Sequence, residues 1–85
     1  MKEIKYVVTD PLGIHARPAG LIVKLAAKFK SAITIECNGK KADAKRIMAV
    51  MSMGIKQGQE ITVTVDGEDE DVAAVEVETF LKENA

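Results

Sequence analysis

The only histidine of the chain, His15, stands two residues before an arginine and three before a proline, in the run of residues 13–19. An imidazole can act as a nucleophile, and the guanidinium of Arg17 offers a planar set of N–H donors that suits phosphate oxygens. Pro18 favours the first turn of a helix, because its φ is fixed and it lacks the N–H that later turns need. The first N–H groups of such a helix, at Ala16 and Arg17, have no intrahelical partners and can bind an anion. The pattern predicts a histidine that carries phosphate itself, with Ala16 and Arg17 binding the phosphoryl group.

The residues after Pro18 are predicted to form a helix over residues 16–28 that positions this site. Apolar side chains recur at three- and four-residue intervals, which is typical of a helix with one buried face. They are Ala19, Ile22, Leu25, Ala26 and Phe29. A first strand over residues 3–8, with apolar residues at every second position, ends at the turn-forming segment 10–13 and leads directly to His15.

The rest of the chain is predicted to form short elements with clear boundaries. Alternating residues indicate strands over residues 33–37 and 61–66, and Asn38-Gly39 is typical of a tight hairpin turn into a returning strand over residues 40–43. A helix is expected over residues 45–53, ended by Gly54. The acidic residues 68–71 are interpreted as the solvated start of a last helix. The order β-α-β-β-α-β-α predicts an α+β fold, a four-stranded antiparallel sheet with three helices on one face.

Length and composition narrow the class of protein. The 85 residues are expected to form one domain, residues 1–85. A net charge of −1 and 4% aromatic residues argue against nucleic-acid binding. A single cysteine excludes a disulfide framework and leaves no metal-ligand spacing, so no metal is expected. No apolar run could span a bilayer, and the N-terminal residues read as a strand rather than a signal peptide. A cytoplasmic protein without membrane insertion is expected.

Apolar residues of the second predicted helix cannot all be buried. If Val50 and Met53 face inward, then Ile47, Met48 and Met51 lie around the opposite side of the helix. They predict a docking surface, although a stripe of methionines can also be core. The first helix is expected to add Gly20, Leu21 and Lys24 to this partner interface. A glycine within a helix, such as Gly20, lowers helix stability relative to alanine. The close approach of a partner is one reason for a glycine at this position; a neutral substitution without functional meaning is the other.

Two segments carry a resemblance to a known family. They are the run of residues 13–19 around His15, and residues 47–55, Ile-Met-Ala-Val-Met-Ser-Met-Gly-Ile, which lead to Gly58 and the strand after it. The chain resembles the HPr phosphocarriers of the bacterial phosphoenolpyruvate-dependent sugar phosphotransferase system over essentially its whole length. The resemblance implies an open-faced β-sandwich. It also implies a carrier, not an enzyme, that accepts a phosphoryl group from phospho-enzyme I and passes it to a IIA component of a sugar permease.

The resemblance also assigns roles to residues. Nδ1 of His15 would accept the phosphoryl group and Arg17 would neutralise it, without a metal or an organic cofactor, in a protein expected to be a monomer. The chain departs from many relatives at Arg46, where they have a serine that a kinase phosphorylates to regulate carbon use. That switch is therefore expected to be absent. A paralogue that serves a nitrogen-linked relay, or a regulator without a transport role, remains the alternative.

Overall fold

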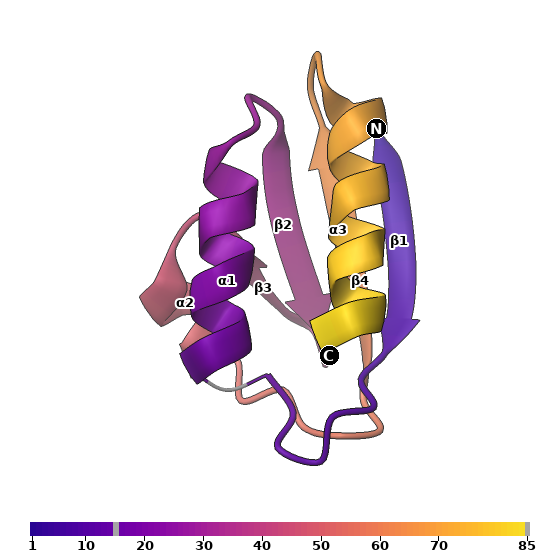
Figure 1. Cartoon of the computed structure of the whole chain (residues 1–85). Helices are drawn as coiled ribbons and strands as arrows, with labels where there is room; N and C mark the ends of the chain where they lie inside the picture. The colour runs from indigo at the N-terminus through magenta and orange to yellow at the C-terminus, as the bar shows by residue number, and fades with distance from the viewer. Residues whose placement is uncertain (15, 85) are drawn as a thin grey trace.

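The computed structural model describes residues 1–14 and 16–84, and the elements follow in the predicted order (Figure 1). The strands are β1 (Lys2–Val7), β2 (Ala32–Cys37), β3 (Lys40–Asp43) and β4 (Glu60–Asp66). The helices are α1 (Ala16–Ala27), α2 (Ile47–Ser52) and α3 (Glu70–Asn84). Residue 15 and residue 85 lie outside the described residues.

The four strands form one antiparallel sheet in the order β1-β4-β2-β3. Because side chains alternate between the two faces of a strand, the register places Ile4 beside Val63 and Val63 beside Ile35, all pointing to the same face. Asn38 and Gly39 join β2 to β3 with φ values of 53° and 78°, as a type I′ hairpin turn requires. The predicted α+β sheet and its hairpin are confirmed.

One core lies between this sheet and the helices, which cover the same face of it (Figure 1). The buried side chains of α1 are Pro18, Ala19, Ile22 and Ala26, and those of α3 are Ala73, Val77 and Leu81. Leu25 and Phe29, which the periodicity places on the buried face of α1, are half-buried at its margin. The helices α1 and α3 pack side by side, so the start of α1 lies near the end of α3.

Two helices begin or end differently from the prediction. The second helix is shorter, because Lys45 and Arg46 belong to a turn before it: Asp43 accepts hydrogen bonds from the N–H of Lys45 at its Oδ1 (2.9 Å) and from the N–H of Arg46 at its carbonyl oxygen (3.0 Å). The first helix ends at Ala27, one residue earlier than expected. After α2, Gly54 has a φ of +62°, which fits the glycine expected after a helix C-terminus.

The acidic segment before α3 is more than a solvated helix start, which corrects its interpretation. One carboxylate oxygen of Asp69 accepts a hydrogen bond from the N–H of Lys30 at 2.8 Å. The other accepts bonds from the N–H of Ser31, at 2.9 Å, and from the Ser31 hydroxyl. Asp69 therefore ties the start of α3 to the connection between α1 and β2. The side chain of Ser31 is fully buried by this contact.

Candidate functional site

The loop before α1 is fixed by a second loop, residues 55–59, that lies against it. The N–H of Val8 donates to the carbonyl of Gln59 at 3.0 Å, and the carbonyl of Val8 accepts from the N–H of Gly58 at 2.8 Å. Farther along, the N–H of Ile14 donates to the carbonyl of Ile55 at 3.0 Å. Ile14 and Ile55 are both buried. The chain on the N-terminal side of residue 15 is thus held by backbone hydrogen bonds and core contacts.

Gly13 makes the close approach of the two loops possible. Its φ is +67°, and an added Cβ would lie 2.2 Å from the carbonyl oxygen of Ile55. A side chain at this position would collide with backbone atoms, and it would also strain the conformation of the chain. The glycine at the start of the predicted motif is therefore required by packing two residues before His15.

On the C-terminal side, α1 begins at Ala16, as predicted. Ala16 and Arg17 are exposed in its first turn, and Pro18 is buried there. The first turn contains no acidic residue. The N-terminal end of a helix carries partial positive charge, so Arg17 adds to this charge where an acidic side chain would offset it. The first turn of α1 thus presents donors and positive charge to solvent, which suits an anion. His15 itself lies outside the described residues.

A surface pocket of about 390 Å³ adjoins this turn. It is lined by Arg17, Pro18 and Leu21 of α1, by Asp10 and Leu12 of the preceding loop, and by Glu83 and Asn84 at the end of α3. The ion pairs within the described part of the chain join Met1 to Glu70 and Lys2 to Asp71, so the guanidinium of Arg17 is not engaged by either carboxylate of its pocket. It is therefore available to another anion.

The predicted docking residues come together on the outer surface of α1 and α2, which pack against each other. Met48 is 74% exposed, while Ile47, Met51 and Leu21 are 40%, 39% and 39% exposed. Lys24 is exposed on the same helix as Leu21, and Val50 is the residue of α2 that enters the core. Exposed apolar side chains with a basic margin are typical of a surface that binds another protein.

Gly20 has a structural role that the sequence did not reveal. The Cδ1 atom of Ile47 lies 3.7 Å from the position that a Cβ of residue 20 would take. Gly20 therefore faces α2, and a methyl group there would make an ordinary van der Waals contact with Ile47. The observed neighbour of this glycine is a side chain of the same molecule, in the seam between the two helices.

Sequence reasoning missed the residues that complete the pocket of Arg17. Asp10 and Leu12 were expected only as part of a turn, and Glu83 and Asn84 carried no signal. Leu12 and Asp10 are joined by a local hydrogen bond from the N–H of Leu12 to Oδ1 of Asp10, 2.9 Å long. Glu83 and Asn84 reach the pocket because α3 ends beside the start of α1. Knowledge of how the two helices pack on the sheet would have been needed to predict this.

Neither a cluster of metal ligands nor a membrane-spanning helix is present in the part of the chain that the structure describes. There, no three side chains of histidine, cysteine, aspartate or glutamate are gathered as a metal site would require. None of the described helices combines the length and apolar character needed to cross a bilayer. The single cysteine, Cys37, is buried as a free thiol in β2.

Comparison with known proteins gives the same answer by sequence and by structure. Residues 2–83 match the family described as the PTS HPr component phosphorylation site. A phosphocarrier protein HPr of Lysinibacillus sphaericus is 47% identical over 83 residues, which cover 98% of this chain and 94% of that protein.

Two solved structures from Thermoanaerobacter tengcongensis have the same fold. The crystal structure of HPr-C-His superposes with a TM-score of 0.91 at 39% identity, and the match covers 96% of this chain and 92% of that one. A crystal structure of an HPr dimer superposes with a TM-score of 0.77 at 38% identity, covering 98% and 95% of the two chains.

Proposed function

The chain belongs to the HPr family of the phosphotransferase system, and we propose that His15 is the residue on which it carries the phosphoryl group. Members of this family are histidine phosphoryl carriers rather than catalysts, and their partners are enzyme I and the IIA components. His15 is the only histidine in the sequence, so it is the only candidate for a phosphohistidine. We further propose that residues 1–85 act as one domain and as a monomer.

The observation that carries the assignment is the first turn of α1. It contains exposed Arg17, has no acidic residue, and directly follows His15 in the chain. A phosphoryl group on a histidine brings two negative charges close to this turn. The helix N-terminus and the guanidinium would stabilise these charges without reorganisation, because both are already in place before transfer. The N–H groups of Ala16 and Arg17 are the next backbone donors along the chain.

The proposed chemistry is a displacement at phosphorus in each direction. In loading, the lone pair of His15 Nδ1 forms the N–P bond while the bond between phosphorus and the phosphohistidine nitrogen of enzyme I breaks. In unloading, an acceptor group of the IIA component attacks, and the N–P bond breaks with its electron pair returning to Nδ1. Charge stabilisation by Arg17 must be moderate, because a carrier has to release its cargo as readily as it takes it.

We propose that both partners dock on the exposed surface of α1 and α2. The apolar centre is formed by Leu21, Ile47, Met48 and Met51, and Lys24 lies at its margin. The exposure of Met48 supports this, because burying such a side chain in a complex removes apolar surface from water. Lys24 and Arg17 would act mainly on the rate of association with an acidic partner.

The test is phosphorylation by phosphoenolpyruvate and enzyme I, followed by intact mass measurement. We expect the mass of one phosphoryl group, which is lost in mild acid and retained in base, as a phosphohistidine requires. His15→Ala should abolish the mass change, while Arg17→Ala should slow loading and transfer but leave the site in place. Phosphate that persists in His15→Ala, or that survives acid, would assign the carrier role to another residue.

The oligomeric state is tested separately, since a relative crystallises as a dimer. Light scattering on the purified protein should give the mass of one chain across a hundredfold range of concentration. The alternative role, a regulator on the same scaffold, would bind its partner but fail to receive phosphate from enzyme I. The loading experiment therefore decides between these two functions.

A further inference from the structure

A second pocket, of about 370 Å³, lies where the β2–β3 hairpin opens at its far end. It exists because the two strands differ in length. The register pairs Thr34 with Asp43, so β2 continues to Ala32 beyond the last residue of β3. The chain then leaves the sheet toward α2, after the N–H of Ala44 has donated to the carbonyl of Ile33 at 2.8 Å. The notch between the two segments is the pocket.

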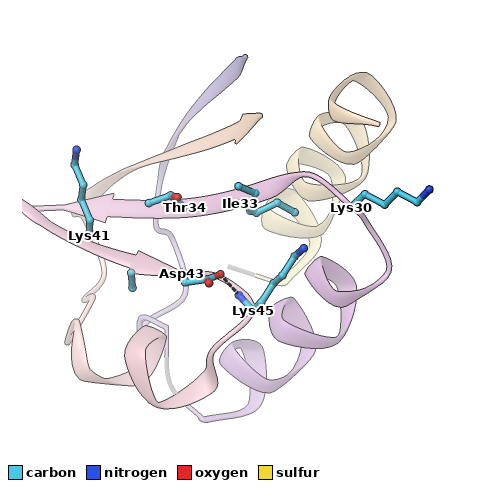
Figure 2. A pocket seen from close by; sticks show the side chains of 8 residues that line it. Lys30, Ile33, Thr34, Lys41, Asp43 and Lys45 are labelled. Atoms are coloured by element: carbon cyan, nitrogen blue, oxygen red, sulfur yellow. Dashed lines mark hydrogen bonds between the residues drawn. The ribbon is translucent and has the colours of Figure 1, made fainter. Parts of the chain in front are cut away.

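Three lysines from three different segments surround the notch (Figure 2). Lys41 stands at one end on β3, whereas Lys30, before β2, and Lys45, after β3, stand at the other end. The Nζ of Lys45 donates to the carbonyl of Phe29 at 2.9 Å, which fixes this half-buried ammonium group at the rim. Lys30 and Lys41 are exposed, and the side chain of Lys30 extends outward from the other lining residues in Figure 2.

The three ammonium groups take part in none of the ion pairs of the described chain, but a carboxylate lies near two of these lysines: Glu36 is opposite Lys41 in the register, and Asp69 accepts from the N–H of Lys30 at 2.8 Å. The acidic side chain in the lining is Asp43, and its Oδ1 is occupied by the N–H of Lys45 at 2.9 Å. The ion pairs found among residues 1–14 and 16–84 lie elsewhere, between β1 or the N-terminal amine and α3. Among the side chains that line the pocket, three are basic and one is acidic.

The segments of the chain that form the notch are basic as a whole. Residues 16–52, which form α1, β2, β3 and α2, contain eight basic and two acidic side chains. Residues 1–14 and 53–84 contain four basic and eleven acidic side chains. The net charge of −1 thus hides two oppositely charged parts, and the notch lies in the basic one. An anion is attracted there over a distance of about one Debye length, about 8 Å at physiological salt.

We propose that this notch binds a small polyanion with two or more phosphoryl groups. The lysines stand at both ends of the notch, so a ligand with charges at both of its own ends would engage all three. The hydroxyl of Thr34, which lines the notch between them, can donate a further hydrogen bond. The site shares none of its lining residues with the pocket of Arg17, so it is distinct from the phosphoryl site.

Protection of the edge strand against pairing with another chain accounts for only one of the three lysines. Lysine on an edge strand discourages pairing with another chain, and β3 is an edge strand of the sheet. That role accounts for Lys41. It does not account for Lys30 or Lys45, because neither residue belongs to β3, and Lys45 is held against a carbonyl instead of extending along the free edge.

The experiment is a titration of the ¹⁵N-labelled full chain with tripolyphosphate at constant ionic strength. We expect saturable shifts of the amides of residues 32–34 and 41–45, with orthophosphate binding more weakly. Lys41→Gln and Lys30→Gln should each weaken binding about twofold to fivefold, as exposed ion pairs do. Both side chains are exposed, so the fold is retained. Lys82→Gln on α3 removes the same charge far from the notch and should leave binding unchanged.

Three results would overturn the proposal. Shifts that increase linearly without saturation would indicate no site. An equal loss of affinity in Lys41→Gln and Lys82→Gln would indicate attraction to overall charge alone. Shifts confined to Ala16 and Arg17 would place the anion at the phosphoryl site instead. Phosphorylation of the same variants by enzyme I is the independent control, because the notch should not affect it.

Discussion

Replacing Gly20 with alanine separates a role in helix packing from a role in partner binding. Gly20 lies in the middle of α1, where glycine is about 1 kcal/mol less favourable than alanine. The added methyl group would meet Cδ1 of Ile47 at 3.7 Å, an ordinary contact that needs no movement of α2. The backbone of Gly20 has no positive φ that alanine would resist. The substitution should therefore stabilise the protein.

The expected gain is about 0.5–1 kcal/mol in the free energy of unfolding, most of the propensity difference. For a domain of this size, 1 kcal/mol corresponds to a rise in Tm of about 4–8 °C. Gly39→Ala is the matched control. Nothing lies within 4 Å of its Cβ position, so a methyl group meets no neighbour there, but its φ is +78°, and alanine should therefore lower the Tm. The pair tests local geometry with the same chemical change.

The assay combines urea and thermal unfolding with phosphoryl transfer from enzyme I. Because the methyl group points to Ile47, it should change the KM of enzyme I for the carrier by less than about twofold. A loss of stability in Gly20→Ala would show that α1 and α2 pack more tightly than the 3.7 Å separation implies. A large rise in KM with unchanged stability would mean that a partner approaches the backbone at this glycine, and the packing argument would be wrong.

Three further substitutions and one kinase treatment have expected outcomes. Asp69→Asn should lower the free energy of unfolding at neutral pH. Hydrogen bonds from Ser31 and from backbone amides hold the pKa of Asp69 below its ordinary 3.8. The stabilisation by the carboxylate is therefore present above pH 3.8 and is lost as the pH falls through the lowered pKa. Urea unfolding at pH 7 and pH 3 should show the difference shrinking in acid. Gly13→Ala should cost more than about 2 kcal/mol in thermal unfolding, because its Cβ would overlap a backbone oxygen, and a native Tm would contradict this. Met48→Asp should raise the KM for transfer about fivefold or more with an unchanged melting curve, whereas unfolding would show that the residue is core. Incubation with ATP and a kinase specific for the family serine should add no phosphate, because Arg46 has no hydroxyl, and a mass gain would reveal another regulatory site.

The strands and long helices were predictable because their patterns are local. Alternation in β4 and the Asn38-Gly39 turn specify a half-buried strand and a hairpin without any knowledge of the partners. The start of α2 was not predictable in this way. Good helix formers precede it at Ala44, Lys45 and Arg46, but Oδ1 of Asp43 accepts the N–H of Lys45 and the chain turns before the helix can begin. A side chain outside the segment sets its boundary.

The same distinction between local pattern and tertiary packing applies to the candidate site and to the anchor of α3. Arg17 and Pro18 could be placed in a first helical turn from sequence, and the exposure of Met48 followed from its position on the side of the helix opposite Val50. Asp69 could not be recognised as an anchor, since its partners, Lys30 and Ser31, are 38 or 39 residues away in the chain. Contacts of this kind depend on how the elements pack, which periodicity does not encode.

The position of β4 between β1 and β2 has a consequence for folding during synthesis on the ribosome. β4 begins at Glu60, and until it has emerged from the ribosome neither β1 nor β2 can form its hydrogen bonds with β4. The nascent chain must therefore carry the apolar faces of β1, α1 and β2 unpaired through most of its synthesis. Acquisition of native structure becomes a late, nearly simultaneous event instead of a gradual one. Ribosome-bound chains stalled before β4 should be cleaved readily by protease, and those that expose β4 and α3 should resist it.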